Sequence, residues 1–300
     1  MSLTESIPEL HEQIEVTTPT NAPGSRRGID WRSVLRSVAL VVFVASLGVW
    51  SYPRIVSPML AARSQTLLEN RFVGDAYNGL LPVGDPIEIG QPVALLDIDA
   101  IGVRRVVVEG TEAEQLAVGP GHLRGSVLPG QLGVSAILGR ATTFGADFGD
   151  LDRLETGDSF RVTTGQGVHE YRVRDVTRRS ADDQSAFVGE GNMLLLVTAT
   201  GGDAPDGRLV VRAELTSPVY PAGAMVEHTT STAELGLHAS TRAAESLVMW
   251  LGLLVLLVSV FAPLRRRMGS RVTWIVFCPV MAVVVLQVFH QIALLLPSST

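Results

Sequence analysis

The sequence predicts an all-β domain with one apolar segment on its N-terminal side and two on its C-terminal side. Between about 86 and 216, short runs rich in Val, Ile and Leu alternate with glycine-containing turns, a pattern typical of small barrels and sandwiches. This region lacks the regular alternation of strands with long helices that a doubly wound fold requires. Outside it, the apolar residues behind the mean hydropathy of +0.29 are concentrated in three long runs.

The expected β domain contains seven or eight short strands in about 130 residues. The segment 161–173, RVTTGQGVHEYRV, predicts a hairpin around Gly165 and Gly167. His169 falls within this hairpin, and we expect its side chain to be solvated. Only one short helix is expected in the domain, near Glu112–Leu116.

The three apolar runs predict membrane-spanning helices. They cover Ser37–Tyr52, Ser246–Leu264 and Val272–Leu296, lengths close to the roughly 17–25 residues that a spanning helix needs. The first run is interpreted as an uncleaved anchor, because a long polar leader precedes it and no clear A-x-A cleavage site follows. His290 interrupts the third run, which indicates either a polar contact between helices or an interfacial position.

Clusters of arginine predict the orientation of the chain. Four precede the first run and four lie between the second and third: Arg26, Arg27, Arg32, Arg36, Arg265, Arg266, Arg267 and Arg271. Because positive residues favour the cytoplasmic side, both clusters are expected in the cytoplasm. The sequence therefore predicts a multi-pass plasma-membrane protein with a cytoplasmic N-terminus, an external β domain and an external C-terminus.

The expected segments follow from these assignments. A disordered cytoplasmic leader and a first spanning helix precede an external linker, in which residues 59–72 are expected to form a helix ending near Gly74. In chain order the segments are the leader 1–33, the span 34–55, the linker 56–85, the β domain 86–216, a stalk 217–244, the span 245–264, a basic cytoplasmic loop 265–271 and the span 272–296.

Composition excludes several classes of function. The net charge of −6 and the pI of about 5.5 provide no basic field for nucleic acid. The single cysteine, Cys278, rules out an intrachain disulfide and lies in an apolar run. No HExxH, zinc-type cysteine cluster or phosphate-binding loop is present, and the six histidines are scattered, so no metal and no cofactor is expected.

Two blocks of the β domain resemble a known family. The segment 106–164 carries VVVEGT, GPGH, PGQLG and GRATTFGADFGDLDRLETGD in that order, and the segment 194–215 reads LLLVTATGGDAPDGRLVVRAEL. Both blocks are similar to sortases, and closest to the class E or D type of actinobacteria and other Gram-positive bacteria. The resemblance covers the whole β domain and implies an eight-stranded β-barrel.

The resemblance also implies a chemistry. Sortases cut a sorting signal of the LPxTG type and join its carbonyl group to an amine. They use a cysteine thiolate as nucleophile, a histidine that protonates the leaving amine, and an arginine that holds the oxyanion or the substrate.

This chain departs from the family at two of these three positions. The family histidine follows the glycine of its IAGH motif, but here Gly139 is followed by Arg140. The family cysteine closes TLTTC, but here Thr198 is followed by Ala199. The arginine nine residues later is retained as Arg208. Alanine has no nucleophile, and arginine stays protonated near neutral pH, so we expect sortase turnover to be lost.

The peptide-binding cleft of the family can persist after its catalytic residues are replaced. If the family cleft persists, Arg140 and Arg208 face each other across it and bind a carboxylate-bearing peptide, such as a sorting signal or its cleaved product. In the alternative, Arg140 swings to solvent or pairs with a local acid. Thr198 is a further binding candidate whose hydroxyl would need an adjacent base for chemistry. His122 matches a non-catalytic family histidine, for which a structural role in a turn is expected.

Three functions therefore compete. The first is a non-catalytic binding or scaffold protein that assists an active sortase or holds surface-protein precursors at the membrane. The second is an active transpeptidase or hydrolase that uses other groups. The third is a membrane assembly component in which the β domain is only a spacer.

Overall fold

A computed structural model of the chain describes residue 48 and residues 51–180, 183–200, 207–223, 241–268 and 270–295. The predicted leader 1–33, nearly all of the first apolar run and the middle of the predicted stalk lie outside these described residues.

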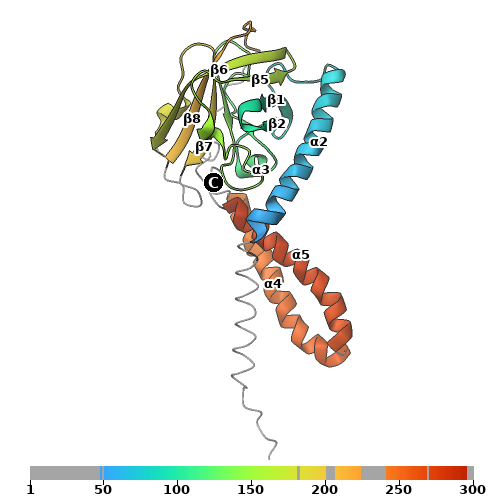
Figure 1. The fold of residues 1–300 in the computed structure, drawn as a ribbon. Helices are drawn as coiled ribbons and strands as arrows, with labels where there is room; N and C mark the ends of the chain where they lie inside the picture. The colour runs from blue at the N-terminus through green and yellow to red at the C-terminus, as the bar shows by residue number, and fades with distance from the viewer. Residues whose placement is uncertain are drawn as a thin grey trace, which may run out of the picture. The chain divides into compact units, whose positions relative to one another are not determined.

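Eight strands close into a barrel, as the sequence and the resemblance predicted (Figure 1). Around the barrel the order is β1-β2-β3-β4-β7-β8-β6-β5, and β1 pairs with β5 to complete the circle. The pairs β2–β3 and β4–β7 are parallel and the others antiparallel. The strands are β1 (Pro92–Ile98), β2 (Val103–Glu109), β3 (Gly121–His122), β4 (Val134–Leu138), β5 (Ser159–Thr164), β6 (Gly167–Ser180), β7 (Met193–Thr200) and β8 (Gly207–Leu215).

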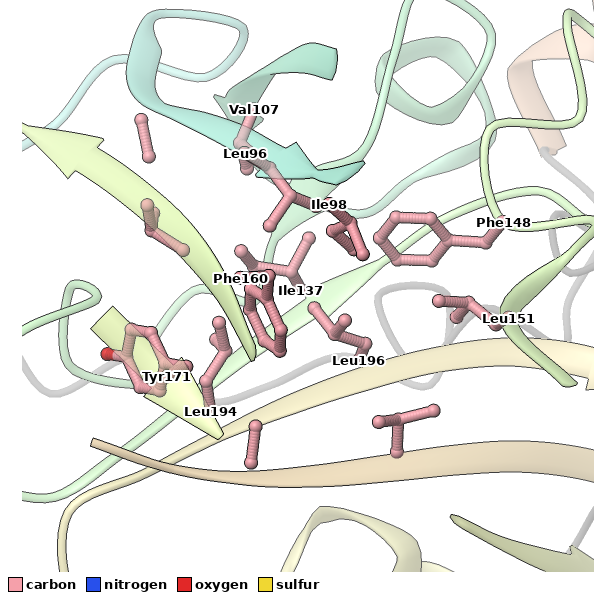
Figure 2. Packing of buried hydrophobic residues seen from close by; sticks show 14 of the residues in the cluster. Leu96, Ile98, Val107, Ile137, Phe148, Leu151, Phe160, Tyr171, Leu194 and Leu196 are labelled. Atoms are coloured by element: carbon pink, nitrogen blue, oxygen red, sulfur yellow. The ribbon is translucent and has the colours of Figure 1, made fainter. Parts of the chain in front are cut away.

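Alternate residues of these strands fill the interior of the barrel. Figure 2 shows Leu96 and Ile98 of β1 and Leu194 and Leu196 of β7 pointing toward one another, each with no exposed surface. Residues two apart along a strand share a face, so this spacing places them together. Such a packed interior leaves the surfaces and ends of the barrel as places for a functional site.

The hairpin around Gly165 is confirmed, but the expectation that His169 is solvated is wrong. Thr164 pairs with Gly167 across the turn between β5 and β6. His169 has no exposed surface, because it lies on the same inward face of β6 as Tyr171. Its ring lies close against Gly130, where a side chain would collide with it, and Tyr220 packs edge-on against it.

The helix expected at residues 59–72 is present and longer. α2 spans Ser57–Tyr77, and a π-helical turn, η1 (Tyr52–Val56), leads into it. The side chain of Gln65 joins α2 to the barrel: its Nε2 donates to the carbonyls of Val106 (3.1 Å) and Val118 (2.9 Å), and its Oε1 accepts from the Val106 N–H (2.9 Å). The predicted short helix near residue 112 is confirmed as α3 (Ala113–Leu116).

Two C-terminal helices are long and apolar enough to cross a membrane. α4 spans Thr241–Met268 and α5 spans Ser270–Leu295, and their qualifying windows are Ala243–Val260 and Ile275–Leu295. Both helices extend through most of the segment 265–271, for which a loop was predicted, and leave only residue 269 between their bounds. The cytoplasmic placement of this segment stays a prediction.

Of the two alternatives for His290, the structure shows a polar contact, and the interfacial position stays a prediction. The Nδ1 of His290 shares a hydrogen bond of 2.7 Å with the Tyr52 hydroxyl, which joins α5 to the turn before α2. The neighbouring Phe289 ring lies so close to Gly48 that any side chain there would collide with it. Small residues permit such close approach between apolar helices.

Candidate functional site

The barrel brings together Arg140, Ala199 and Arg208, the three positions to which the resemblance to sortases assigns the chemistry. Leu138 of β4 pairs with Val197 of β7, and the Gly139 N–H donates to the Val197 carbonyl at 3.0 Å, so the ladder continues beyond β4. Arg140 and Ala199 follow two residues later on their respective chains. Ala199 pairs directly with Arg208 of β8. The side chains at these three positions therefore belong to one face of the sheet.

Other parts of the chain cover this face. Leu116 of α3 packs with Leu138 and Val197 in one apolar cluster, which Phe187 also contacts. Phe187 belongs to the short 3₁₀ turn η4 (Gln184–Phe187) between β6 and β7. As a result Ala199 is 6% exposed, Arg208 3% and Arg140 2%.

Arg140 is held by neutral groups of the covering segment. Its Nε donates to the carbonyl of Leu116 (3.2 Å) and its Nη2 to that of Ala113 (3.2 Å), while Nη1 donates to the Thr143 hydroxyl (3.0 Å). Its guanidinium also lies over the Phe144 ring, 4.9 Å from the ring centre. The alternative in which Arg140 swings to solvent is therefore wrong, since its hydrogen bonds fix it against α3.

Burial affects the charge of Arg140 without removing it. Desolvation lowers the pKa of Arg140 to about 10, which still leaves the side chain protonated at neutral pH. It cannot exchange protons as a histidine does. Arg140 is therefore a fixed cation that binds carbonyls at both ends of α3, those of Ala113 and Leu116.

Arg208 contacts the other covering element. Its guanidinium lies 5.0 Å from the centre of the Phe187 ring. Hydrogen bonds from Ser185, together with the charges of Arg179 and Arg208, hold the pKa of Asp183 below its usual value. The two arginines share a face of the sheet, but one is engaged with α3 and the other lies beside η4. The carboxylate site proposed between them stays a prediction.

A cavity of about 370 Å³ lies beside Ala199 at the end of the barrel. Phe148 and Leu209 line it and also belong to the interior cluster of the barrel. Thr198 lines it too, but its hydroxyl donates to the Gly139 carbonyl (2.8 Å) and so supports the β4–β7 ladder. That bond gives the hydroxyl proton of Thr198 to a backbone carbonyl and not to a base.

His122 lies in a hydrogen-bonded chain with the connectivity of a catalytic triad. Its Nδ1 is 2.8 Å from Glu109 Oε2, and its Nε2 is 3.0 Å from the Ser126 hydroxyl. However, Nε2 is also 3.0 Å from the Val127 carbonyl, and the Ser126 hydroxyl donates to the Leu123 carbonyl (2.7 Å). With these partners His122 donates from both nitrogens and cannot take a proton from Ser126. The arrangement holds a turn, the role expected for His122.

The ion pair of His122 and Glu109 predicts a pH dependence of stability. Burial disfavours the imidazolium, but the hydrogen bond and charge of Glu109 outweigh it and raise the pKa of His122 above its usual value. A raised folded-state pKa stabilises the fold fully below the unfolded-state value of about 6.5, and this contribution is lost as pH rises through the folded-state pKa. His122→Asn should therefore cost more stability at about pH 6 than at about pH 9.

Unfolding midpoints of the wild type and His122→Asn across this pH range measure the effect. A difference between the two proteins that does not change with pH would show that His122 is not charged in the fold. A substitution of His169 provides a control with the opposite pH trend. Burial lowers the pKa of the His169 imidazole, whereas Glu109 raises that of His122.

Sequence reasoning missed the partners of these residues. Glu109 belongs to the VVVEGT motif, but no role was predicted for it. Its position at the end of the apolar run VVV indicates that its charge is buried. Phe144 and Phe187 carried no such signal, since they contact the arginines only through the folded turns. Among the residues that the structure describes, no three His, Cys, Asp or Glu side chains gather in a group that could hold a metal ion.

Comparison with known proteins agrees with the barrel. Residues 96–216 match the family model described as "Sortase domain". Sortase D of Bacillus subtilis (strain 168) is 31% identical over 113 residues, which are 37% of this chain and 56% of that protein. The chain thus spans just over half the length of this curated relative.

Two solved structures are among those to which this chain is similar. The Clostridium perfringens Sortase D5 transpeptidase is 24% identical with a TM-score of 0.44, and the match covers 53% of this chain and 99% of that one. A sortase E variant from Streptomyces avermitilis is 28% identical with a TM-score of 0.40, over 44% and 91% of the two chains. The eight-stranded barrel of residues 92–215 is a sortase-fold domain, by its strand order and by the family match.

Proposed function

We propose that this chain carries a non-catalytic sortase-like domain of the class E or D type that acts as a membrane-held scaffold in surface-protein sorting. The observation that carries the proposal is Ala199. The motif spacing assigns Ala199 to the position of the family nucleophile, and this residue pairs with Arg208, is 6% exposed and has only a methyl side chain.

The missing chemistry follows from the residues. Transpeptidation by a sortase forms a thioester between a cysteine sulfur and the carbonyl carbon of the substrate, and it expels an amine that an acid must protonate. Cys278, the only cysteine of the chain, belongs to α5 and not to the barrel. Arg140 holds its proton too tightly to serve as that acid. Neither of the two positions, Ala199 and Arg140, therefore carries the group that its half of the reaction needs.

A scaffold role agrees with how the former catalytic face is used. Arg140 fixes α3 and Arg208 lies beside η4, so both arginines support the structure of the face instead of leaving it open. Partners are then expected to bind the outer surface of the barrel. The partners we propose are an active sortase or surface-protein precursors that carry sorting signals.

Turnover tests this proposal directly. The full-length protein is incubated with LPxTG- and LAxTG-type peptides and an amine, and products are identified by mass spectrometry. We expect no product from the wild type or from Ala199→Cys. Product from the wild type would overturn the proposal, because it would require a nucleophile other than cysteine in the barrel.

Thiol labelling then shows whether the face is covered in solution. In a Cys278→Ser background, Ala199→Cys should react with a maleimide about 100-fold more slowly than Val168→Cys, whose position is 58% exposed on the hairpin. Equal rates would mean an open groove. In that case product from Arg140→His/Ala199→Cys would favour a peptide-binding cleft that lost only its chemistry.

A further inference from the structure

A second cavity, of about 520 Å³, lies where α5, the beginning of α2 and the α3 turn meet. This volume falls within the roughly 300–1,000 Å³ of small-molecule sites. Val56 and Leu60 line it from the η1–α2 side, and Val283 and Leu286 line it from α5. Neither the family chemistry nor the proposed scaffold role uses this cavity.

One wall of the cavity is a single face of a helix of membrane-spanning length. Its α5 residues are spaced three or four apart, from Val283 through Leu286 and His290 to Leu294, as residues on one helical face are. All of them fall within the apolar window Ile275–Leu295. Leu286 is 46% exposed, so this face opens to the surroundings of the helix. In a bilayer those surroundings are lipid.

The barrel supplies the opposite wall. Phe144 lines the cavity from the loop after Arg140, and its ring also meets His290 edge-on at 5.9 Å. Its backbone has a φ of +51°, which is unusual for a bulky residue. The Ser57 hydroxyl accepts its N–H (3.2 Å), and Arg140 lies on its ring. The loop is therefore fixed in a conformation that places an aromatic ring at the cavity.

We propose that this cavity binds the acyl chain of a bilayer lipid. Its walls are mainly aliphatic and aromatic, and two of its polar side chains, Tyr52 and His290, bond to each other. A peptide is a poor occupant, because its backbone N–H and C=O groups would need partners that such walls do not supply. An acyl chain needs none, and the adjoining helix face gives it a path from the membrane. Gln287 and Glu114 are available to orient a polar head group.

Photocrosslinking in nanodiscs tests the site. The full-length protein is reconstituted with a phosphatidylcholine that carries a diazirine near the end of one acyl chain, and labelled peptides are identified by mass spectrometry. We expect label on the barrel peptide that contains Phe144, which is 2% exposed and out of reach for lipid that only surrounds the helices. Label confined to α4 and α5 would overturn the proposal.

Cavity-filling variants make the test specific. Leu286→Trp and Leu60→Trp fill the site from opposite walls, and both residues are exposed enough to tolerate the larger ring. Each should reduce the label on the Phe144 peptide about tenfold. Ile292→Trp, also on α5 but outside the cavity lining, should leave it unchanged. An equal reduction in all three variants, or in none, would contradict binding in the cavity.

Discussion

Glu109→Leu is expected to lower the free energy of unfolding by about 3–5 kcal/mol, the typical cost of removing one partner of a buried ion pair. Glu109 is 2% exposed and bonds to His122, which is equally buried. Without the carboxylate, the imidazole must lose its proton or remain charged without its partner. Either outcome destabilises the turn that joins β3 to β4. Chemical unfolding of the full-length protein measures the change.

Two further variants separate the ion pair from general damage. Glu190→Leu, at an exposed position, should change the unfolding free energy by less than about 0.5 kcal/mol. The double variant Glu109→Leu/His122→Leu should recover part of the loss, because two apolar side chains often replace a buried pair at little cost. If the double variant loses as much as Glu109→Leu and His122→Leu, each measured alone, lose together, the two residues do not interact as described.

Arg140→Ala is expected to lower the unfolding free energy by about 3 kcal/mol, from lost packing and from buried carbonyls left without a donor. The carbonyls are those of Ala113 and Leu116, and the packing is against Phe144. Arg174→Ala, at an exposed position on β6, is the matched control and should have little effect.

Arg140→Met divides this loss into its causes. Methionine retains much of the packing but donates no hydrogen bonds, so the difference between the alanine and methionine variants reports the packing contribution. A wild-type midpoint for Arg140→Ala would mean that Arg140 does not fix α3, and the covered face would lose its main support.

The sequence was sufficient for the parts of the fold that depend on local pattern. The hairpin at Gly165 and the helix α3 follow from turn residues and from apolar spacing over a few positions. The prediction of a closed eight-stranded barrel came from the family resemblance. Local pattern could not supply it, because closure depends on the pairing of β1 with β5, whose paired residues lie about 65 positions apart. His169 was misjudged for a related reason: its burial depends on Gly130 and Tyr220, both distant in the chain.

The candidate site divides in the same way. The substitutions proposed at Arg140 and Ala199 rest on the motif spacing alone, and the strand register places both positions side by side. The motif spacing does not predict that α3 and η4 lie over this face. Both elements pack through residues such as Leu116 and Phe187, and nothing in the sequence around these residues indicates that contact. The basic segment 265–271 was predicted to be a loop, yet arginine is a good helix former, and α4 and α5 extend through most of it.

The three hydrogen bonds of Gln65 have a mechanical consequence. η1 and α2 form one continuous helical segment from Tyr52 to Tyr77. Gln65 joins this segment by hydrogen bonds to the backbone of β2 and of the turn after α3. A domain on a flexible linker samples a wide volume, whereas a domain joined to a stiff helix keeps one distance and one orientation relative to the start of that helix. A binding partner of the barrel must therefore reach it at a fixed distance from Tyr52, where this helical segment begins.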